Sequence, residues 1–262
     1  MPAQNIDDVL HILDGIIADC KAKRDPLGYF PALYRQVTLS VKKGIETGYF
    51  DDGPRMDRFD ALFANRYFAA YEAFRSGGHP TQSWQVAFDS TQSGRLIILQ
   101  DLLVGINAHV NLDLGVVTGE TFQGLALAGF HDDFNKINAI LAGLLPAVEA
   151  TVGEFSPLLD VLEKIGGEDA VEVLNFSLDA ARDDAWLHAQ ILSLQPPSSW
   201  PLAVQAIDDK VKFLGRLIAQ PVGLVASAVA LIRDTESQDV PAIIDALNSI
   251  VPATGAALPS PA

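Results

Sequence analysis

Apolar residues recur every three or four positions along most of the chain, which is the spacing of one face of an α-helix. The first such stripe contains Ile6, Leu10, Leu13 and Ile17, and residues 57–75 carry aromatic side chains at the same spacing. No segment combines alternating β-branched residues with hairpin turns, and the sequence has no repeat of fixed period. The pattern therefore predicts an all-α fold, built as a single-domain multi-helix bundle.

Residues 94–114, with the sequence GRLIILQDLLVGINAHVNLDL, form the most apolar of the predicted helices. We expect this helix to be buried all round and to stand at the centre of the bundle. Its polar residues come as two pairs spaced four apart, His109 with Asp113 and Asn107 with Asn111, so each pair lies on one face. Buried polar groups need partners. We expect His109 and Asp113 to carry the chemistry, and the two asparagines to hold helices together.

We expect one helical domain over residues 1–250 and a disordered tail, rich in Pro and Ala, over residues 251–262. The most apolar late stretch runs from Leu214 to Ile232. It contains Arg216 and Pro221 and is short for a membrane span, so we expect buried helix there and no membrane span.

The composition is that of a packed globular protein, with 49% apolar and 19% charged residues. Lys and Arg total 18 against 33 Asp and Glu, which gives a net charge of −15. We therefore expect no nucleic-acid partner, because no basic stripe is present to displace phosphate counterions. The expected partner is a small-molecule substrate. The single cysteine, Cys20, rules out an internal disulfide, and the N-terminus lacks the pattern of a signal peptide. A cytoplasmic location is the expectation, and the oligomeric state stays open.

Two pairs of side chains on two helices predict a metal site. His109 and Asp113 read H-x-x-x-D on the central helix, and Asp184 and His188 read D-x-x-x-H on a helix predicted over 168–194. Two antiparallel helices with such pairs are able to surround a divalent cation, and imidazole with carboxylate suits zinc, iron or manganese. A zinc-bound water of lowered pKa would then be the nucleophile. The plain alternative is that these pairs form ordinary hydrogen bonds or a solvated charge run.

Further candidates surround this site. Asp133 and Glu72 are candidate general bases, and Arg66 is a candidate partner for the central helix. The residues expected to line a substrate pocket are Tyr67, Tyr71, Phe74, Asn107 and Trp186. The signatures of P-loop, dinucleotide-binding, zincin and nucleophile-elbow proteins are absent, and so is the doubled E-x-x-H of ferritin-like di-iron proteins.

The string LLVGINAHVNLDL, with FANRYFAAYEAF before it and ARDDAWLHA after it, resembles an uncharacterised bacterial domain-of-unknown-function family. In that family a long apolar helix carries Asn-Ala-His and a later Asp. The resemblance covers most of residues 30–195, and the string from Asn107 to Asp113 is its most specific part. It implies an all-α fold and almost nothing about chemistry.

The H-x-x-x-D pair is also similar to a motif of the all-α zinc phospholipase C and P1 nuclease group, where it lies on a buried helix and ligates catalytic zinc. The Gln-Pro-Leu-His that follows in that group is here the stretch 114–117, Leu-Gly-Val-Val, without the histidine. The group's N-terminal metal-binding tryptophan has no counterpart at Met1. The resemblance therefore implies only a ligand role for His109 and Asp113.

Three functional hypotheses follow. The first is a metal-dependent enzyme, a hydrolase by default, that acts on a small apolar or amphipathic molecule. The second is a metal-free cyclase or isomerase of secondary metabolism that uses His109 and Asp113 as an acid–base pair. The third is a binding or structural protein without chemistry, whose buried polar residues form satisfied networks.

Overall fold

Helices account for nearly all regular structure in the computed structural model, which describes residues 1–162 and 178–251 and has no β-strand within these ranges. The all-α prediction is confirmed. The first part of the chain forms α1 (Ile6–Lys23), the short 3₁₀ turn η1 (Pro26–Gly28), α2 (Tyr29–Glu46), α3 (Gly53–Arg75) and α4 (Gln82–Gln92). All of the predicted tail except Val251 lies outside the described residues.

Local side-chain caps set where the first long helices begin. The side chain of Asn5 accepts a hydrogen bond from the backbone N–H of Asp8 at 2.9 Å, which satisfies one free donor at the start of α1. Asp52 caps α3 in the same way through the N–H of Arg55, also at 2.9 Å. These caps fix the first residues of α1 and of α3, and α3 later supplies part of the wall of the site.

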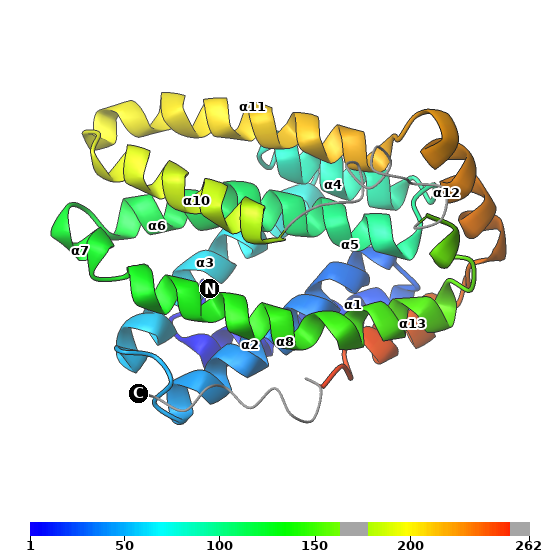
Figure 1. Ribbon diagram of the computed structural model, residues 1–262, viewed down its shortest axis with the longest axis horizontal. Helices are drawn as coiled ribbons and strands as arrows, with labels where there is room; N and C mark the ends of the chain where they lie inside the picture. Colours follow the sequence, from blue (N-terminus) through cyan, green and yellow to red (C-terminus); the bar gives the residue numbers. More distant parts are fainter. Residues whose placement is uncertain (163–177, 252–262) are drawn as a thin grey trace.

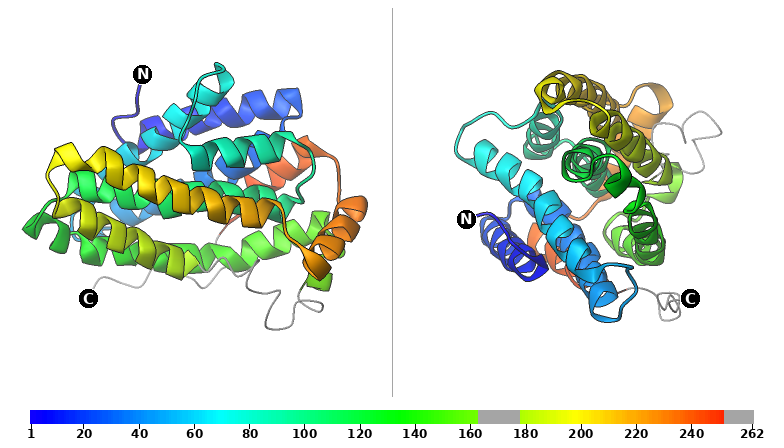
Figure 2. Two further views of the ribbon diagram at one scale, coloured as in Figure 1. Left: turned by 90° about the horizontal axis from the view of Figure 1, so that it is seen from above. Right: turned by 90° about the vertical axis from the view of Figure 1, so that its left-hand side faces the viewer.

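The central helix runs without a break from Ile98 to Thr121. It consists of α5 (Ile98–Ile106), the π-helical segment η2 (Asn107–Leu114) and α6 (Gly115–Thr121). The end-on view in Figure 2 shows this helix surrounded by the others. Its polar pairs lie in η2, and each of the four side chains is at most 4% exposed. The expected buried helix is therefore present, and it extends past the predicted end at 114.

One face of the central helix carries the asparagine pair and fixes α11 (Trp200–Ala219). Asn111 donates through Nδ2 to Oδ1 of Asn107 at 3.0 Å, and Asn107 donates through Nδ2 to the carbonyl oxygen of Val211 at 2.9 Å. This bond joins residues 104 positions apart in the sequence. The amide pair thus links two helices, as the sequence predicted.

The same face meets α10 (Leu178–Ser193) through small residues. A Cβ atom on Gly115 would lie 2.7 Å from the carbonyl oxygen of Ala185, and one on Gly119 would lie 2.8 Å from that of Ala189. Glycines and alanines spaced by four on the two helices let the two backbones approach closely. The helical axis of α6 is therefore held against α10 by contacts that any larger side chain would block.

The remaining helices close the bundle (Figure 1). They are α7 (Leu125–Ala128), α8 (His131–Phe155), the turn η3 (Pro197–Ser199), α12 (Gly223–Thr235) and α13 (Val240–Leu247). In Figure 1, α8 runs along the front, with α10 above it. The apolar stretch 214–232 is divided between α11 and α12, whose axes differ by 63°.

Two helical segments of the described chain are long and apolar enough to cross a membrane, judged by length and composition. They are Ile98–Thr121 and Leu125–Phe155, and the bent pair formed by η3–α11 and α12 passes the same test. In Ile98–Thr121, 89% of the apolar window is buried by other helices, against 17% in Leu125–Phe155. The first segment is therefore a core helix of this bundle, and the absence of a membrane span stays a prediction.

The close contact between α6 and α10 predicts opposite effects for two glycine substitutions. Gly115→Ala should lower the free energy of unfolding by about 1–3 kcal/mol, because the new methyl group overpacks against Ala185 and His188. Gly153→Ala, in α8 with nothing within 4 Å of the added carbon, should raise it by about 0.5–1 kcal/mol through helix propensity. Urea unfolding followed by circular dichroism measures both. Equal stabilisation by the two changes would contradict the packing described here.

Candidate functional site

Asp113 is a buried carboxylate that contacts side chains from two other helices. Its Oδ1 accepts a hydrogen bond from Nε of Arg66 in α3 at 2.9 Å, and its Oδ2 accepts one from Nε1 of Trp84 in α4 at 2.8 Å. Oδ2 also lies 3.6 Å from Nδ1 of His109. Charge-assisted bonds of this kind offset the cost of burying the carboxylate. They also confirm that Arg66 pairs with the central helix.

His109 is enclosed by aromatic rings. Its ring stacks on Phe63 with a centroid distance of 3.8 Å and an angle of 9°, and the ring of Tyr34 lies 4.5 Å away. The side chain is buried, and among the described residues neither ring nitrogen has a partner within normal hydrogen-bond distance. Burial lowers the pKa of His109 below its ordinary value, although Asp113 acts in the opposite direction. The ring is therefore neutral at pH 7, and a proton on Nδ1 facing Asp113 leaves the lone pair on Nε2.

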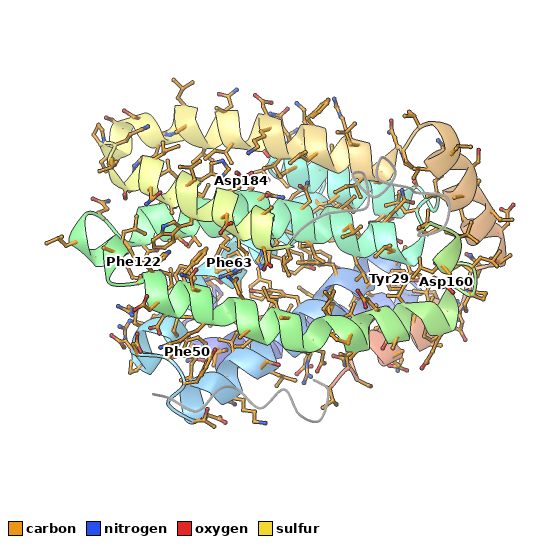
Figure 3. The ribbon with its side chains drawn as sticks, viewed as in Figure 1. Tyr29, Phe50, Phe63, Phe122, Asp160 and Asp184 are labelled. Carbon is orange, nitrogen blue, oxygen red and sulfur yellow. The ribbon has the colours of Figure 1, made fainter. Side chains whose placement is uncertain are left out.

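The ring of His109 forms part of the wall of an apolar cavity of about 140 Å³. The wall comes from α2, α3, the central helix, α8 and α10, and consists of almost nothing but carbon. Figure 3 shows Phe63 between the ribbons of α8 and α10. Leu145 of α8, which is 52% exposed, lies at the edge of the cavity. An apolar cavity of about 150 Å³ is known to bind a molecule of the size of benzene, so this one has room for a single small ring.

A second chamber of about 50 Å³ adjoins this cavity, and Tyr34, Phe63 and Arg182 line both. Asp60 of α3 lines only the smaller chamber. It is 7% exposed, and its Oδ2, like the hydroxyl of Tyr34, has no hydrogen-bond partner among the described residues. Burial, with a smaller contribution from Asp57, raises the pKa of Asp60 to about 7. Burial also raises the pKa of Tyr34 well above its ordinary value, so both oxygens keep their protons at mildly acidic pH.

Arg182 brings a cation to the wall that the two chambers share. Its Nε donates to Oδ1 of Asn138 and its Nη2 to the carbonyl oxygen of Phe134, and the guanidinium lies 4.4 Å from the centre of the Phe134 ring. Burial lowers the pKa of Arg182 to about 10, which still leaves it charged at pH 7. Arg182 therefore ties α10 to α8 and raises the electrostatic potential in both chambers.

The structure does not bring the four predicted metal ligands together. Asp184 is half-buried, and its Oδ2 accepts a hydrogen bond from Lys210 at 2.7 Å, on the side of α10 that faces α11 (Figure 3). His188 packs against Gly115 and the backbone of Asn111. Within residues 1–162 and 178–251, no three His, Cys, Asp or Glu side chains lie close enough to hold a metal ion. The two predicted pairs stay apart because α10 packs on the face of the central helix that carries positions 111 and 115. Positions 109 and 113 lie on another face, toward α2, α3 and α4.

The two candidate general bases lie away from the cavity. Asp133 accepts hydrogen bonds from Arg55 at 2.7 Å and from the backbone N–H groups of Asp51 and Asp52, so it anchors the loop before α3 to the start of α8. Burial acts to raise the pKa of Asp133, but its hydrogen bonds outweigh burial and hold it below the ordinary value. Glu72 is exposed on α3.

The predicted pocket residues surround the site without lining the larger cavity. Tyr67 is nearest, with its ring 6.4 Å from that of His109. The others have different partners: Tyr71 bonds to Cys20, Phe74 packs on Phe88, Trp186 packs on Phe134, and Asn107 bonds to Val211. The rings that do line the cavity are those of Phe30, Tyr34 and Phe63.

Sequence reasoning missed Tyr34, Asp60 and Arg182. Asp60 left a readable signal, because it lies beside Phe59 and three positions before Phe63, on the apolar stripe of an amphipathic helix. Arg182 belongs to a run of charges that suited a solvated surface, and only the fold shows that this one side chain is buried. Tyr34 left no signal that separates it from an ordinary core tyrosine.

The chain belongs to DUF5995, a family of unknown function, whose sequence model matches residues 6–221. This confirms the resemblance to an uncharacterised family over most of the chain. No curated protein and no solved structure matches the chain. The resemblance to the zinc phospholipase C and P1 nuclease group therefore rests on the H-x-x-x-D motif alone.

The raised pKa of Asp60 predicts a pH-dependent stability difference. Between about pH 4 and pH 7 the folded protein holds a proton on Asp60 that the unfolded chain releases, so ionisation costs stability as the pH rises. Asp60→Asn removes this cost. Its free energy of unfolding relative to the wild type should rise by about 2 kcal/mol between pH 5 and pH 7. The slope for one proton is at most about 1.4 kcal/mol per pH unit.

Urea unfolding at four pH values measures this difference. Asp89→Asn, at an exposed position on α4, is the control and should show no such trend. A difference between Asp60→Asn and the wild type that stays constant with pH would contradict a protonated, buried Asp60.

Proposed function

We propose that this protein binds a small, largely apolar molecule in the cavity and that His109, oriented by Asp113, accepts or donates a proton at the bound molecule. The observation that carries the proposal is the state of the His109 ring. It is buried in the wall of an apolar cavity, and both of its nitrogens lack a hydrogen-bond partner among the described residues. An unsatisfied buried polar group costs about 1–3 kcal/mol. A ligand atom opposite Nε2 would remove that cost.

The side chains around His109 support the acid–base role. Because burial lowers its pKa, the ring is neutral at pH 7 and Nε2 is free to accept a proton. The resulting imidazolium would be stabilised by Asp113, whose own position is fixed by Arg66 and Trp84. The carbon walls keep water away from the reacting atoms and strengthen these electrostatic interactions. The arrangement suits proton transfer within one small molecule, as in an isomerase or a cyclase.

The metal-dependent hypothesis fits these side chains less well. Both oxygens of Asp113 already accept hydrogen bonds, and Asp184 is paired with Lys210 on another side of α10. Within the described parts of the chain, His109 therefore has one neighbouring carboxylate, Asp113, and both oxygens of that carboxylate already accept hydrogen bonds. A non-catalytic binding protein would have the same cavity. Loss of a catalysed reaction on substitution of His109 would distinguish an enzyme from such a protein.

Binding of a neutral probe tests the proposed function. Toluene and benzyl alcohol should each produce saturable changes in the imidazole NMR signals of His109 and leave those of His188 unchanged. His188 of α10 is a strong internal control, because it is also buried and its pKa is also lowered. It packs against the face of the central helix that points away from the cavity. In the free protein, His109 should titrate below pH 6.5.

Two tryptophan substitutions show where the probe binds. Leu141→Trp fills the cavity from α8 and should abolish the effect on His109, whereas Leu187→Trp, at a half-exposed position on α10, should preserve it. Equal responses of His109 and His188, or binding that survives Leu141→Trp unchanged, would overturn the proposal.

A further inference from the structure

Two side chains that line the smaller chamber each carry an oxygen that makes no hydrogen bond to any described residue. These oxygens are the hydroxyl of Tyr34 and Oδ2 of Asp60, and both side chains are more than nine-tenths buried. The other side chains that line it are apolar, apart from Arg182, whose guanidinium already donates to Asn138 and Phe134. A chamber of about 50 Å³ has room for one small polar group and little more.

Both side chains are hydrogen-bond donors at mildly acidic pH. Tyr34 retains its phenolic proton, and Asp60, with a pKa of about 7, is a carboxylic acid over much of this range. Two O–H donors in a chamber lined mostly by apolar side chains stabilise negative charge that develops on an oxygen atom. The buried charge of Arg182 on the shared wall acts in the same direction.

Tyr34 connects this chamber to His109. Its ring lies 4.5 Å from the imidazole ring, and Tyr34 and Phe63 line both chambers. A molecule whose ring occupies the larger cavity and whose oxygen enters the smaller chamber would therefore present its ring carbons to His109. The bound molecule would therefore meet hydrogen-bond donors at its oxygen and a base beside its ring, and these two requirements define a class of ligand.

We propose that the smaller chamber binds the carbonyl oxygen of a small cyclic ketone, or of a related carbonyl compound, through Tyr34 and Asp60, and that His109 removes a proton from the adjacent carbon. This inference rests on the proposed function and specifies its substrate class. The C–H bond breaks and its proton moves to Nε2 of His109. The electron pair forms a C=C bond while the carbonyl π electrons move to oxygen, and return of a proton to carbon restores the ketone or yields its isomer. No other reactant is needed.

A pair of ligands of equal shape tests the binding part. Cyclohexanone and methylenecyclohexane differ only in whether oxygen or a methylene group occupies the chamber. The dissociation constant of cyclohexanone divided by that of methylenecyclohexane should increase by roughly threefold to tenfold in Tyr34→Phe, which is the expected effect of losing one hydrogen bond. Asp60→Leu should act similarly, and Asp60→Asn, which keeps a donor, should recover much of the preference.

The matched controls are two buried groups that line neither chamber. The hydroxyl of Tyr67, like that of Tyr34, has no hydrogen-bond partner in the part of the chain that the structure describes, and Asp101 is a buried acid with a raised pKa. Neither Tyr67→Phe nor Asp101→Asn should change the ratio. A ratio that is the same in Tyr34→Phe, Asp60→Leu and the wild type would overturn the inference.

Exchange of the protons next to the carbonyl group tests the chemical part. In D₂O, the wild-type protein should accelerate deuterium uptake by cyclohexanone in proportion to protein concentration, measured by NMR. His109→Gln and Tyr34→Phe should each reduce the protein-dependent rate at least tenfold, while Tyr67→Phe should not. Absence of protein-dependent exchange in the wild type would also overturn the inference. Failure of toluene to bind would refute the proposed function itself, whereas toluene binding without ketone preference or exchange would refute only the inference.

Discussion

The need to stabilise the buried carboxylate of Asp113 constrains the centre of this protein. Removing one partner of a buried ion pair typically costs about 3–5 kcal/mol, because the remaining charge has no compensation. Here the partners come from different helices, Arg66 from α3 and Trp84 from α4, and both bond directly to the carboxylate. These bonds fix the rotation of the central helix relative to α3 and α4. The same rotation directs His109 toward Phe63 and Tyr34, so one electrostatic requirement sets both the packing and the geometry of the site.

The central helix divides its two tasks between two faces. The face with Asn107, Asn111 and Gly115 meets α10 and α11 through amide hydrogen bonds and close backbone contacts. The face with His109 and Asp113 meets α2, α3 and α4. Both polar pairs lie in the π-helical segment η2, a form that is rare and often occurs at functional sites. The structural face fixes the helix against α10 and α11, and the other face presents to a cavity a histidine that has no hydrogen-bond partner among the described residues.

Periodicity in the sequence was sufficient to predict the class of fold, the buried central helix and the placement of its two polar pairs on different faces. These features depend on residues close in sequence. The partners of Asp113 lie 29 and 47 positions away, and a helical period does not specify which helix packs on which face. For this reason Asp184 and His188 resembled ligands for His109, whereas the fold rotates them onto another face. Asp60 and Tyr34 reach the site because α2 and α3 pack beside each other, and that arrangement is not encoded in any local motif.

We infer that Asp113 orients His109 toward the larger cavity and that this cavity accepts a small ring. A high-resolution crystal structure of the protein soaked with bromobenzene tests it most directly, because the anomalous signal of bromine locates the ligand without bias. One bromine site is expected inside the cavity beside Phe63, with Nδ1 of His109 still facing Asp113. Bromine bound only at the surface, or an imidazole ring turned away from Asp113, would contradict it.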